Sequence, residues 1–288
     1  MRRTVGSFGV LLAVASLACT HAASPVAAPE STPPEPSPTA TAEPVKRELS
    51  VRFLGVGGFR FAVGDDAVLT APLFTNPSML DVTVGQIASR HDLVDAFLGD
   101  ASNTKAILSG HAHYDHLMDV PYVWTRTEGA MIYGNSSAKH LLAGFAPDLA
   151  PGCPAAPADA PWAIVPRENV VALDDPANDV VDYRMCGNLE TCSGTHASAG
   201  SWVPVPNSHV RIRALCSSHP DQLLVVHFGE GCVDADVCAP PTKGPDWKEG
   251  STLAYLIDFL DPVSGVPEFR VYYQDAPFDA PISHAHPD

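Results

Sequence analysis

The stretch KAILSGHAHYDHLMD, residues 105–119, joins a short apolar run to a cluster of histidines and an aspartate. The first part, KAILSG, has the length and composition of a short buried strand. His111, His113, Asp115 and His116 follow it at once, in a chain with only 12 histidines among 288 residues. Because α/β proteins gather functional side chains on the loops that leave buried strands, the stretch predicts an α/β fold with a site at its centre.

Two interpretations of this cluster compete. In an extended loop His111 and His113 point the same way, so that both imidazoles can bind one cation. Asp115 and His116, at the turn into a helix, can then face a second cation, and this combination of ligands suits zinc and related divalent ions. In the alternative interpretation, Asp115 caps the helix and the histidines are solvated loop residues. The spacing H-x-H-x-D-H at a strand–helix junction favours the metal site.

Strand and helix patterns alternate along the rest of the chain, without internal repeats. Residues 51–74, VRFLGVGGFRFAVGDDAVLTAPLF, predict a meander with a turn at GDD. Helical spacing predicts helices over 84–98, over 115–126, and over 135–145 with Asn135 or Ser136 as cap. In the second of these Pro121 is tolerable only if it lies near the first turn. Further strands are predicted at 130–134, 170–173, 202–206, 210–216, 223–229, 252–260 and 269–275.

The composition and charge exclude some classes of protein. Apolar residues make up 45% of the chain, which is long enough for one large domain with a proper core. The formal net charge of −16 argues against wrapping by nucleic acid, because that requires a basic face. We therefore expect no nucleic-acid partner; the acidic balance does not by itself name another partner.

The N-terminus predicts export to the bacterial cell envelope. Residues 1–19 combine a basic start, an apolar stretch too short for a membrane span, and small residues before Cys19. They resemble a lipoprotein signal, in which Cys19 would be lipidated and hold the protein at a membrane; simple secretion is the alternative. Residues 20–47 are rich in Pro, Ala, Ser and Thr and predict a disordered tether before a domain over 48–288.

The cysteines permit disulfides in such an oxidising compartment. Besides Cys19 there are six, which allow 15 pairings. No C-x-x-C pair indicates a metal site among them. The short spacings predict local pairs Cys186–Cys192 and Cys232–Cys238, while Cys153 and Cys216 stay unassigned.

The histidine motif and the opening meander resemble those of a known superfamily. H-x-H-x-D-H after an apolar strand resembles the signature of the metallo-β-lactamase superfamily, and the meander 51–74 is similar to the opening of that fold. The pattern continues in order from about residue 50 to the end of the chain. The resemblance implies an αββα four-layer sandwich, with its last part missing, and a hydrolytic site that holds one or two zinc ions, or other divalent metals such as Mn or Fe.

The same resemblance requires a histidine after a later strand. His219, in VRIRALCSSHPDQ, follows the strand 210–216 and occupies that position. His209, on the turn before this strand, is its rival. His196 lies in a Ser/Gly/Ala loop and is interpreted as solvated, while His227 lies inside an apolar run and is interpreted as a core residue.

The resemblance also implies an aspartate that bridges both metals. Asp275, at the end of FRVYYQDAP, fits this role, although a turn aspartate at a strand end is the plain alternative. The implied ligands of the first metal are His111, His113 and His219. Those of the second metal are Asp115, His116 and Asp275.

Two positions depart from the superfamily pattern. Ala71 stands where an aspartate before proline usually supports the metals, a loss expected to weaken metal binding about 10–100-fold. The superfamily's last histidine ligand is also missing, since only 13 residues follow Asp275 and His284 and His286 lie too close to it. We expect that the sequence is truncated, because the missing strands would leave a sheet edge exposed.

The implied activity is hydrolysis by a metal-bound hydroxide of an ester, lactone, amide or phosphodiester. Asp115 is the candidate catalytic residue that orients the water and accepts its proton. The opening meander and ligand set most resemble the branch with phosphodiesterase, lipase-like and sugar-lactonase members, and this resemblance implies a small-molecule or lipid-like substrate. The alternative from another class is a non-catalytic envelope lipoprotein that keeps the fold for binding or metal capture.

Overall fold

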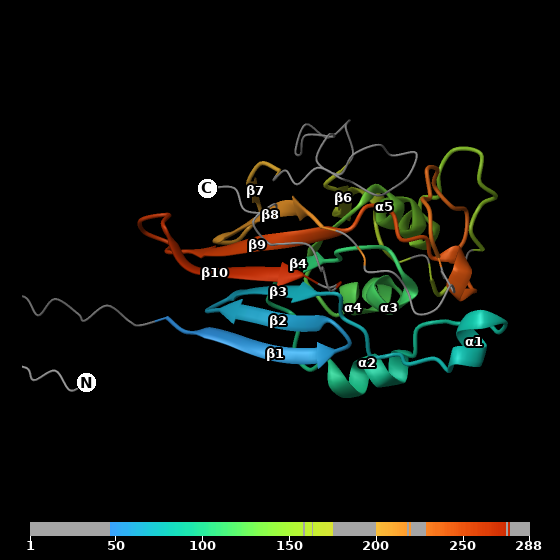
Figure 1. The fold of residues 1–288 in the computed structure, drawn as a ribbon, viewed down its shortest axis with the longest axis horizontal. Coiled ribbons are helices and arrows are strands. Elements are labelled where there is room, and N and C mark those ends of the chain that lie inside the picture. The colour runs from blue at the N-terminus through green and yellow to red at the C-terminus, as the bar shows by residue number, and fades with distance from the viewer. Residues whose placement is uncertain are drawn as a thin grey trace, which may run out of the picture. The chain divides into compact units, whose positions relative to one another are not determined.

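Two β-sheets stacked face to face form the centre of the structure (Figure 1). The computed structural model describes residues 47–157, 159–162, 164–174, 200–217, 219, 229–274 and 276. All of them belong to one compact unit, Lys46–Asp288. His196, His227, Asp275, His284 and His286, the strand predicted at 223–229 apart from Gly229, and the pair Cys186–Cys192 lie outside the described residues.

The first sheet has six strands in sequence order, and its geometry sets the edge at which the histidines lie. Its first three strands are antiparallel, and the GDD turn closes the second hairpin, where Val63 pairs with Asp66 and Gly64 has φ +59°. The last four strands are parallel, so their carboxyl ends meet at one edge. The strands are β1 (Leu49–Gly55), β2 (Gly58–Val63), β3 (Asp66–Thr70), β4 (Thr104–Leu108), β5 (Met131–Gly134) and β6 (Val170–Ala172).

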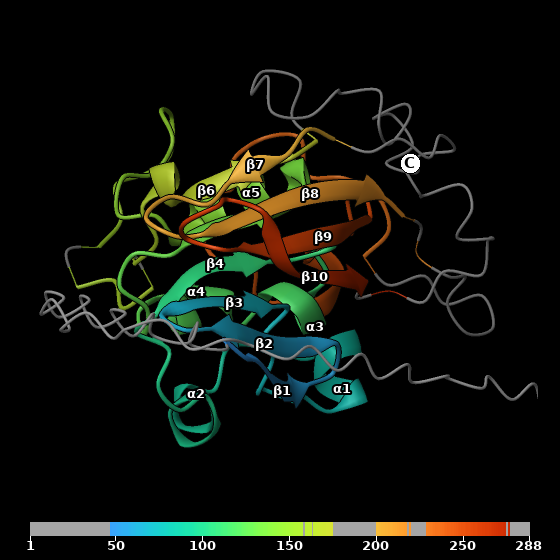
Figure 2. The same cartoon turned by 90° about the vertical axis from the view of Figure 1, so that its left-hand side faces the viewer.

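The second sheet is antiparallel and lies over the first, as the view turned by 90° shows (Figure 2). Alternate residues of both sheets meet in one buried apolar cluster, which includes Val68 and Leu108 of the first sheet and Ile212, Tyr255 and Ile257 of the second. This period of two is the pattern that predicted strands here. In spatial order the strands are β10 (Pro267–Gln274), β9 (Leu253–Leu260), β8 (Val210–Cys216) and β7 (Val203–Pro204).

The helices pack on the other face of the six-stranded sheet, where Leu69, Ile107 and Ile132 join their buried residues in a second apolar cluster. No helix in the described ranges has the length and apolar composition to cross a bilayer. The helices are α1 (Met79–Thr83), α2 (His91–Phe97), α3 (Tyr114–Leu117), α4 (Val120–Trp124) and α5 (Ser136–Leu142), with 3₁₀ turns η1 (Ala143–Phe145), η2 (Arg167–Asn169) and η6 (Gly244–Asp246).

The architecture is therefore mixed α/β, with one helical layer and two sheet layers in the described residues. Among the described residues, the outer face of the four-stranded sheet carries a polar row and no helix contact. Asp258, fully buried, binds Arg211 and Arg270 on the flanking strands, and Trp202 lies against both guanidinium groups. None of the described residues forms the fourth, helical layer of the expected sandwich.

Two predicted helices are shorter than their spacing indicated. The helix predicted over 84–98 begins only at His91, because the Ile87 N–H donates to Thr242 and the Arg90 N–H to the Thr75 hydroxyl. The helix predicted over 115–126 divides into α3 and α4. Pro121 lies in the first turn of α4, as expected, because proline has no N–H to continue an earlier helix.

Other local predictions are confirmed by hydrogen bonds. Asn135 caps α5, since its side-chain oxygen accepts from the Ala138 N–H. The strands predicted at 130–134, 170–173, 210–216 and 252–260 correspond to β5, β6, β8 and β9. Period and capping chemistry thus locate these elements without tertiary information.

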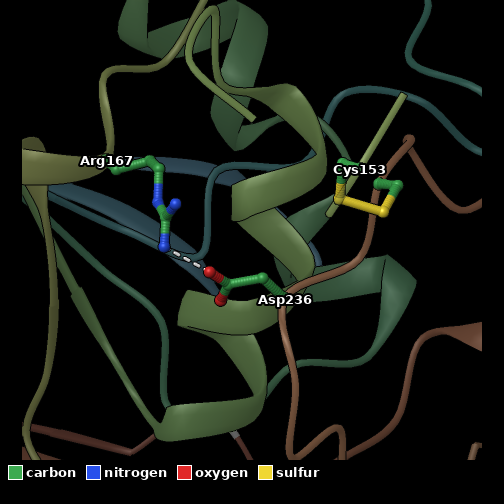
Figure 3. Close-up of a disulfide and its surroundings, with 4 residues drawn as sticks. Cys153, Arg167 and Asp236 are labelled. Carbon is green, nitrogen blue, oxygen red and sulfur yellow. Dashed lines mark hydrogen bonds and ion pairs between the residues drawn. A yellow bond between two sulfur atoms is a disulfide. The ribbon is translucent and has the colours of Figure 1, made fainter. Parts of the chain in front are cut away.

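The predicted pair Cys232–Cys238 is wrong. Cys238 is bonded to Cys153, 85 residues earlier, with an S–S distance of 2.01 Å (Figure 3). Cys232 is also disulfide-bonded, and because Cys238 is already paired with Cys153, the partner of Cys232 is another residue. Proximity in the fold, not spacing in the sequence, selects the pairs.

Candidate metal centre

The loop that carries His111 and His113 leaves the carboxyl end of β4 and is held from the second sheet. The Leu253 N–H donates to the Gly110 carbonyl over 2.7 Å, and the Tyr255 hydroxyl to the Ser109 carbonyl over 2.8 Å. Both donors belong to β9. The start of β9 therefore fixes the backbone from which the first two imidazoles project.

Four imidazoles converge next to this loop. The ring centroid of His111 lies 4.8 Å from that of His113, 4.2 Å from that of His116 and 5.0 Å from that of His219. The His113 and His219 rings are 5.1 Å apart. His111, His113 and His116 are 1%, 6% and 5% exposed. The interpretation of these histidines as solvated loop residues is therefore wrong.

The ligand atoms form two overlapping groups. His111, His113 and His219 present nitrogens within 4.8 Å of one another, and so do His111, Asp115 and His116 with a nitrogen or a carboxylate oxygen each. Asp115 is only partly buried, and its Oδ2 lies 3.6 Å from Nε2 of His116. The structure thus brings together five of the six predicted ligands, while Asp275 lies outside the described residues.

The protonation state of His113 is compatible with binding of a cation. Burial, together with the neighbouring His111, His219 and His116, lowers the pKa of His113 to about 2. This imidazole is therefore neutral at neutral pH, as a metal ligand must be. Its Nε2 is buried and makes no well-aligned hydrogen bond among the described residues, so that a neighbouring group is needed to satisfy it. Imidazole nitrogens with a carboxylate suit zinc, manganese or iron.

The expected helix cap is a different residue. His113, not Asp115, is the N-cap of α3, and it makes no side-chain capping hydrogen bond. Asp115 lies within the first turn, where its negative charge is compatible with the positive end of the backbone. The capping interpretation of Asp115 is therefore wrong, and its carboxylate stays available to the cluster.

The rival histidine lies elsewhere. His209 precedes β8, its side chain is 53% exposed, and its ring contacts Asp66 at 3.3 Å. His219 follows β8 and joins the cluster. Since a strand separates the two residues, they lie at its opposite ends.

Ala71 offers no support to the cluster. It is fully buried, has φ +33°, and its N–H donates to the Leu108 carbonyl over 2.8 Å. A methyl side chain there cannot orient an imidazole. Any supporting carboxylate has to come from another segment.

Two further carboxylates escaped sequence analysis. Asp119 ends the stretch quoted first and accepts hydrogen bonds from the Phe74 and Thr75 N–H groups, both at 2.7 Å. Its position three residues after His116 was the only feature of the sequence that could have identified it. Glu249 lies 3.9 Å from Nε2 of His113 and comes from an irregular segment whose sequence carries no such signal.

Together, the two stacked sheets and the buried cluster of four histidines and an aspartate define a mixed α/β protein with a candidate metal centre. No family model matches the chain, and comparison with curated proteins finds no match. Solved structures give weak likenesses. One is CmlA, a diiron beta-hydroxylase from Streptomyces venezuelae, with 12% identity and a TM-score of 0.37 over 81% of this chain and 30% of that one.

Two further solved structures are similarly distant. Igni18, a metallo hydrolase from the archaeon Ignicoccus hospitalis, has 13% identity and a TM-score of 0.32, over 73% of this chain and 55% of that one. The Rm3 metallo-beta-lactamase has 14% identity and a TM-score of 0.30, over 76% and 55%. The chain spans less than two thirds of the length of each of the three. At TM-scores below 0.5 these likenesses do not place it in a family.

Proposed function

We propose that the protein is a metal-dependent hydrolase with the αββα fold of the metallo-β-lactamase superfamily. One observation carries the proposal: His111, His113 and His219, from two distant parts of the sequence, bring their ring nitrogens within 4.8 Å in a buried site. His111 also belongs to the neighbouring group with Asp115 and His116. Such a shared arrangement suits one or two divalent cations, zinc first among them.

Each side chain has a distinct role in this proposal. When bound, a divalent cation supplies Lewis acidity, which polarises the scissile bond and brings the pKa of a water toward neutrality. The buried imidazoles hold the cation and exclude bulk solvent. Asp115 has the exposure needed to reach substrate and water; its carboxylate orients the attacking water and takes its proton. Asp275 completes the second group.

The substrate class and cellular place belong to the same proposal. The substrate is a small or lipid-like ester, lactone or phosphodiester. The protein is exported to the bacterial cell envelope and attached to a membrane through lipidated Cys19. Labelling of cells with a tagged fatty acid tests the attachment: the parent protein is expected to incorporate the label and Cys19→Ser to lose it, whereas equal labelling refutes it.

A second candidate, a non-catalytic protein that binds or captures metal, is favoured by one observation. Ala71 is buried and contributes no carboxylate to the cluster. Turnover separates the two candidates. A screen of ester, lactone and phosphodiester substrates with the metal-loaded protein is expected to give hydrolysis that Asp115→Asn abolishes. Tight metal binding without hydrolysis of any of them supports metal capture.

Metal analysis tests the centre itself. The purified protein is expected to retain at least one divalent ion per chain after extensive dialysis, and His113→Ala to lose most of it. His209→Ala is the matched control, because this histidine is exposed and contacts Asp66 instead of the cluster. Equal metal content in the parent and in His113→Ala would falsify the assignment.

A further inference from the structure

Glu249 is a carboxylate outside the two ligand groups that lies close to a buried ring nitrogen of the cluster. Its Oε2 lies 3.9 Å from Nε2 of His113, and the two side chains are 18% and 8% exposed. The separation exceeds a hydrogen bond by about 0.7 Å, a gap that a small rotation of either side chain closes.

The backbone of Glu249 is tied directly to the histidine loop. Its carbonyl accepts from the Ala112 N–H over 2.9 Å, and Ala112 is the residue between His111 and His113. The same carbonyl accepts from the Asn135 side chain over 2.7 Å. Glu249 therefore keeps a constant position relative to the two imidazoles.

The other oxygen of the carboxylate is also held. Oε1 accepts a hydrogen bond from the Thr252 hydroxyl over 2.9 Å, which leaves Oε2 directed to His113. Gly229 lies against the same edge of the His113 ring, its backbone has φ +71°, and its carbonyl accepts from the Glu249 N–H. A Cβ at Gly229 would come within 3.0 Å of the His113 ring, so the ring is closely confined.

The segment before Glu249 is fastened to the helical layer. Cys238 is bonded to Cys153, and Asp236 binds Arg167 (Figure 3). Asp236 also contacts His140. These contacts hold a segment that has only one 3₁₀ turn of regular structure between residues 229 and 250. A segment held this firmly can present a side chain with constant geometry.

We propose that Glu249 is a positioning residue of the metal centre. Its carboxylate accepts a hydrogen bond from Nε2 of His113 and leaves Nδ1 as the nitrogen that takes the cation. An ionised carboxylate only accepts, so it selects the tautomer with the proton on Nε2. Glu249 belongs to neither of the two ligand groups found among the described residues, which favours action through His113 over direct ligation. The inference rests on the proposed metal-dependent function.

Metal affinity of the full protein tests this role. Zn²⁺ binding is measured by competition with a chromophoric chelator, and Co²⁺ binding by the visible spectrum of the ion. Glu249→Ala is expected to weaken Zn²⁺ binding about 10–100-fold and to shift the Co²⁺ bands, because a carboxylate behind a ligand histidine raises its basicity. Glu249→Gln is expected to recover part of the affinity, since its amide oxygen still accepts from Nε2.

Two controls separate positioning from general structure. Glu268→Gln removes a carboxylate that pairs with Arg47, and it is expected to leave both readouts unchanged. Asp236→Asn loosens the same segment without touching His113, and its effect is expected to be less than a third of that of Glu249→Ala. An affinity of Glu249→Ala within twofold of the parent overturns the inference, as does an equal effect of Asp236→Asn.

The outcomes also distinguish this inference from the proposed function. Loss of metal in His113→Ala without any effect of Glu249→Ala refutes the role of Glu249 and leaves the metal centre intact. A parent protein that binds neither Zn²⁺ nor Co²⁺ refutes the metal centre, and the role of Glu249 with it.

Discussion

Replacement of Asp119 by alanine is expected to destabilise the fold beside the metal centre strongly. The carboxylate is fully buried and accepts three hydrogen bonds, from the N–H groups of Phe74 and Thr75 and from the Thr75 hydroxyl, each at 2.7 Å. Hydrogen bonds to a charged group contribute about 1.5–3 kcal/mol each, and the loss leaves two buried N–H donors without an acceptor. Even the lower value for each of the three predicts a loss of about 4.5 kcal/mol.

Thermal unfolding followed by circular dichroism measures this loss. In a domain of this size 1 kcal/mol corresponds to about 2–4 °C, so Asp119→Ala is expected to lower the midpoint by about 10 °C. Asp119→Asn keeps one acceptor oxygen and is expected to show about half of that effect. The matched control is Asp92→Ala, because the Asp92 carboxylate is exposed and pairs only with Arg90. A midpoint of Asp119→Ala within about 2 °C of the parent would refute the reasoning.

Two further predictions concern pH and the disulfide. The folded-state pKa of His113 is about 2, below the ordinary value of 6.5, so as pH falls through that window the unfolded chain binds a proton that the folded chain does not. The free energy of unfolding of the metal-free protein is thus expected to fall by up to about 1.4 kcal/mol per pH unit because of this residue. In urea unfolding, His113→Gln is expected to show a shallower dependence of this free energy on pH. Equal slopes of the free energy against pH in the parent and the variant contradict the prediction. Joint replacement of Cys153 and Cys238 by serine removes a cross-link between residues 85 positions apart. It is expected to lower the free energy of unfolding, measured by chemical denaturation, by about 3–5 kcal/mol. An unchanged midpoint of denaturation would contradict this prediction.

Local periodicity and turn chemistry were sufficient for much of the fold. The strand β4, the hairpin turn at Gly64 and the cap Asn135 all follow from interactions between residues close in sequence. The spacing of His111, His113, Asp115 and His116 also identified a candidate metal loop before any tertiary contact was known. Short-range signals suffice there because a strand exit and a helix entry are themselves local structures.

Helix lengths followed the tertiary contacts instead. The spacing of apolar residues from 84 to 98 predicts one helix, yet Ile87 pairs with Thr242 and the helix starts at His91. A hydrogen bond to a residue about 155 positions away outweighs the modest preference of a short segment for helix. Sequence spacing cannot contain that information.

By itself, the sequence determined the mixed α/β class, the strand that delivers the histidines and the local set of candidate ligands. Only the tertiary structure decided that His219 and not His209 joins them, that Cys153 pairs with Cys238, and that Glu249 lies behind His113. The physical reason is the range of the interactions. Periodicity and capping act over a few residues, whereas the approach of side chains about 85 to 136 positions apart depends on how two sheets stack and on where an irregular segment is fastened.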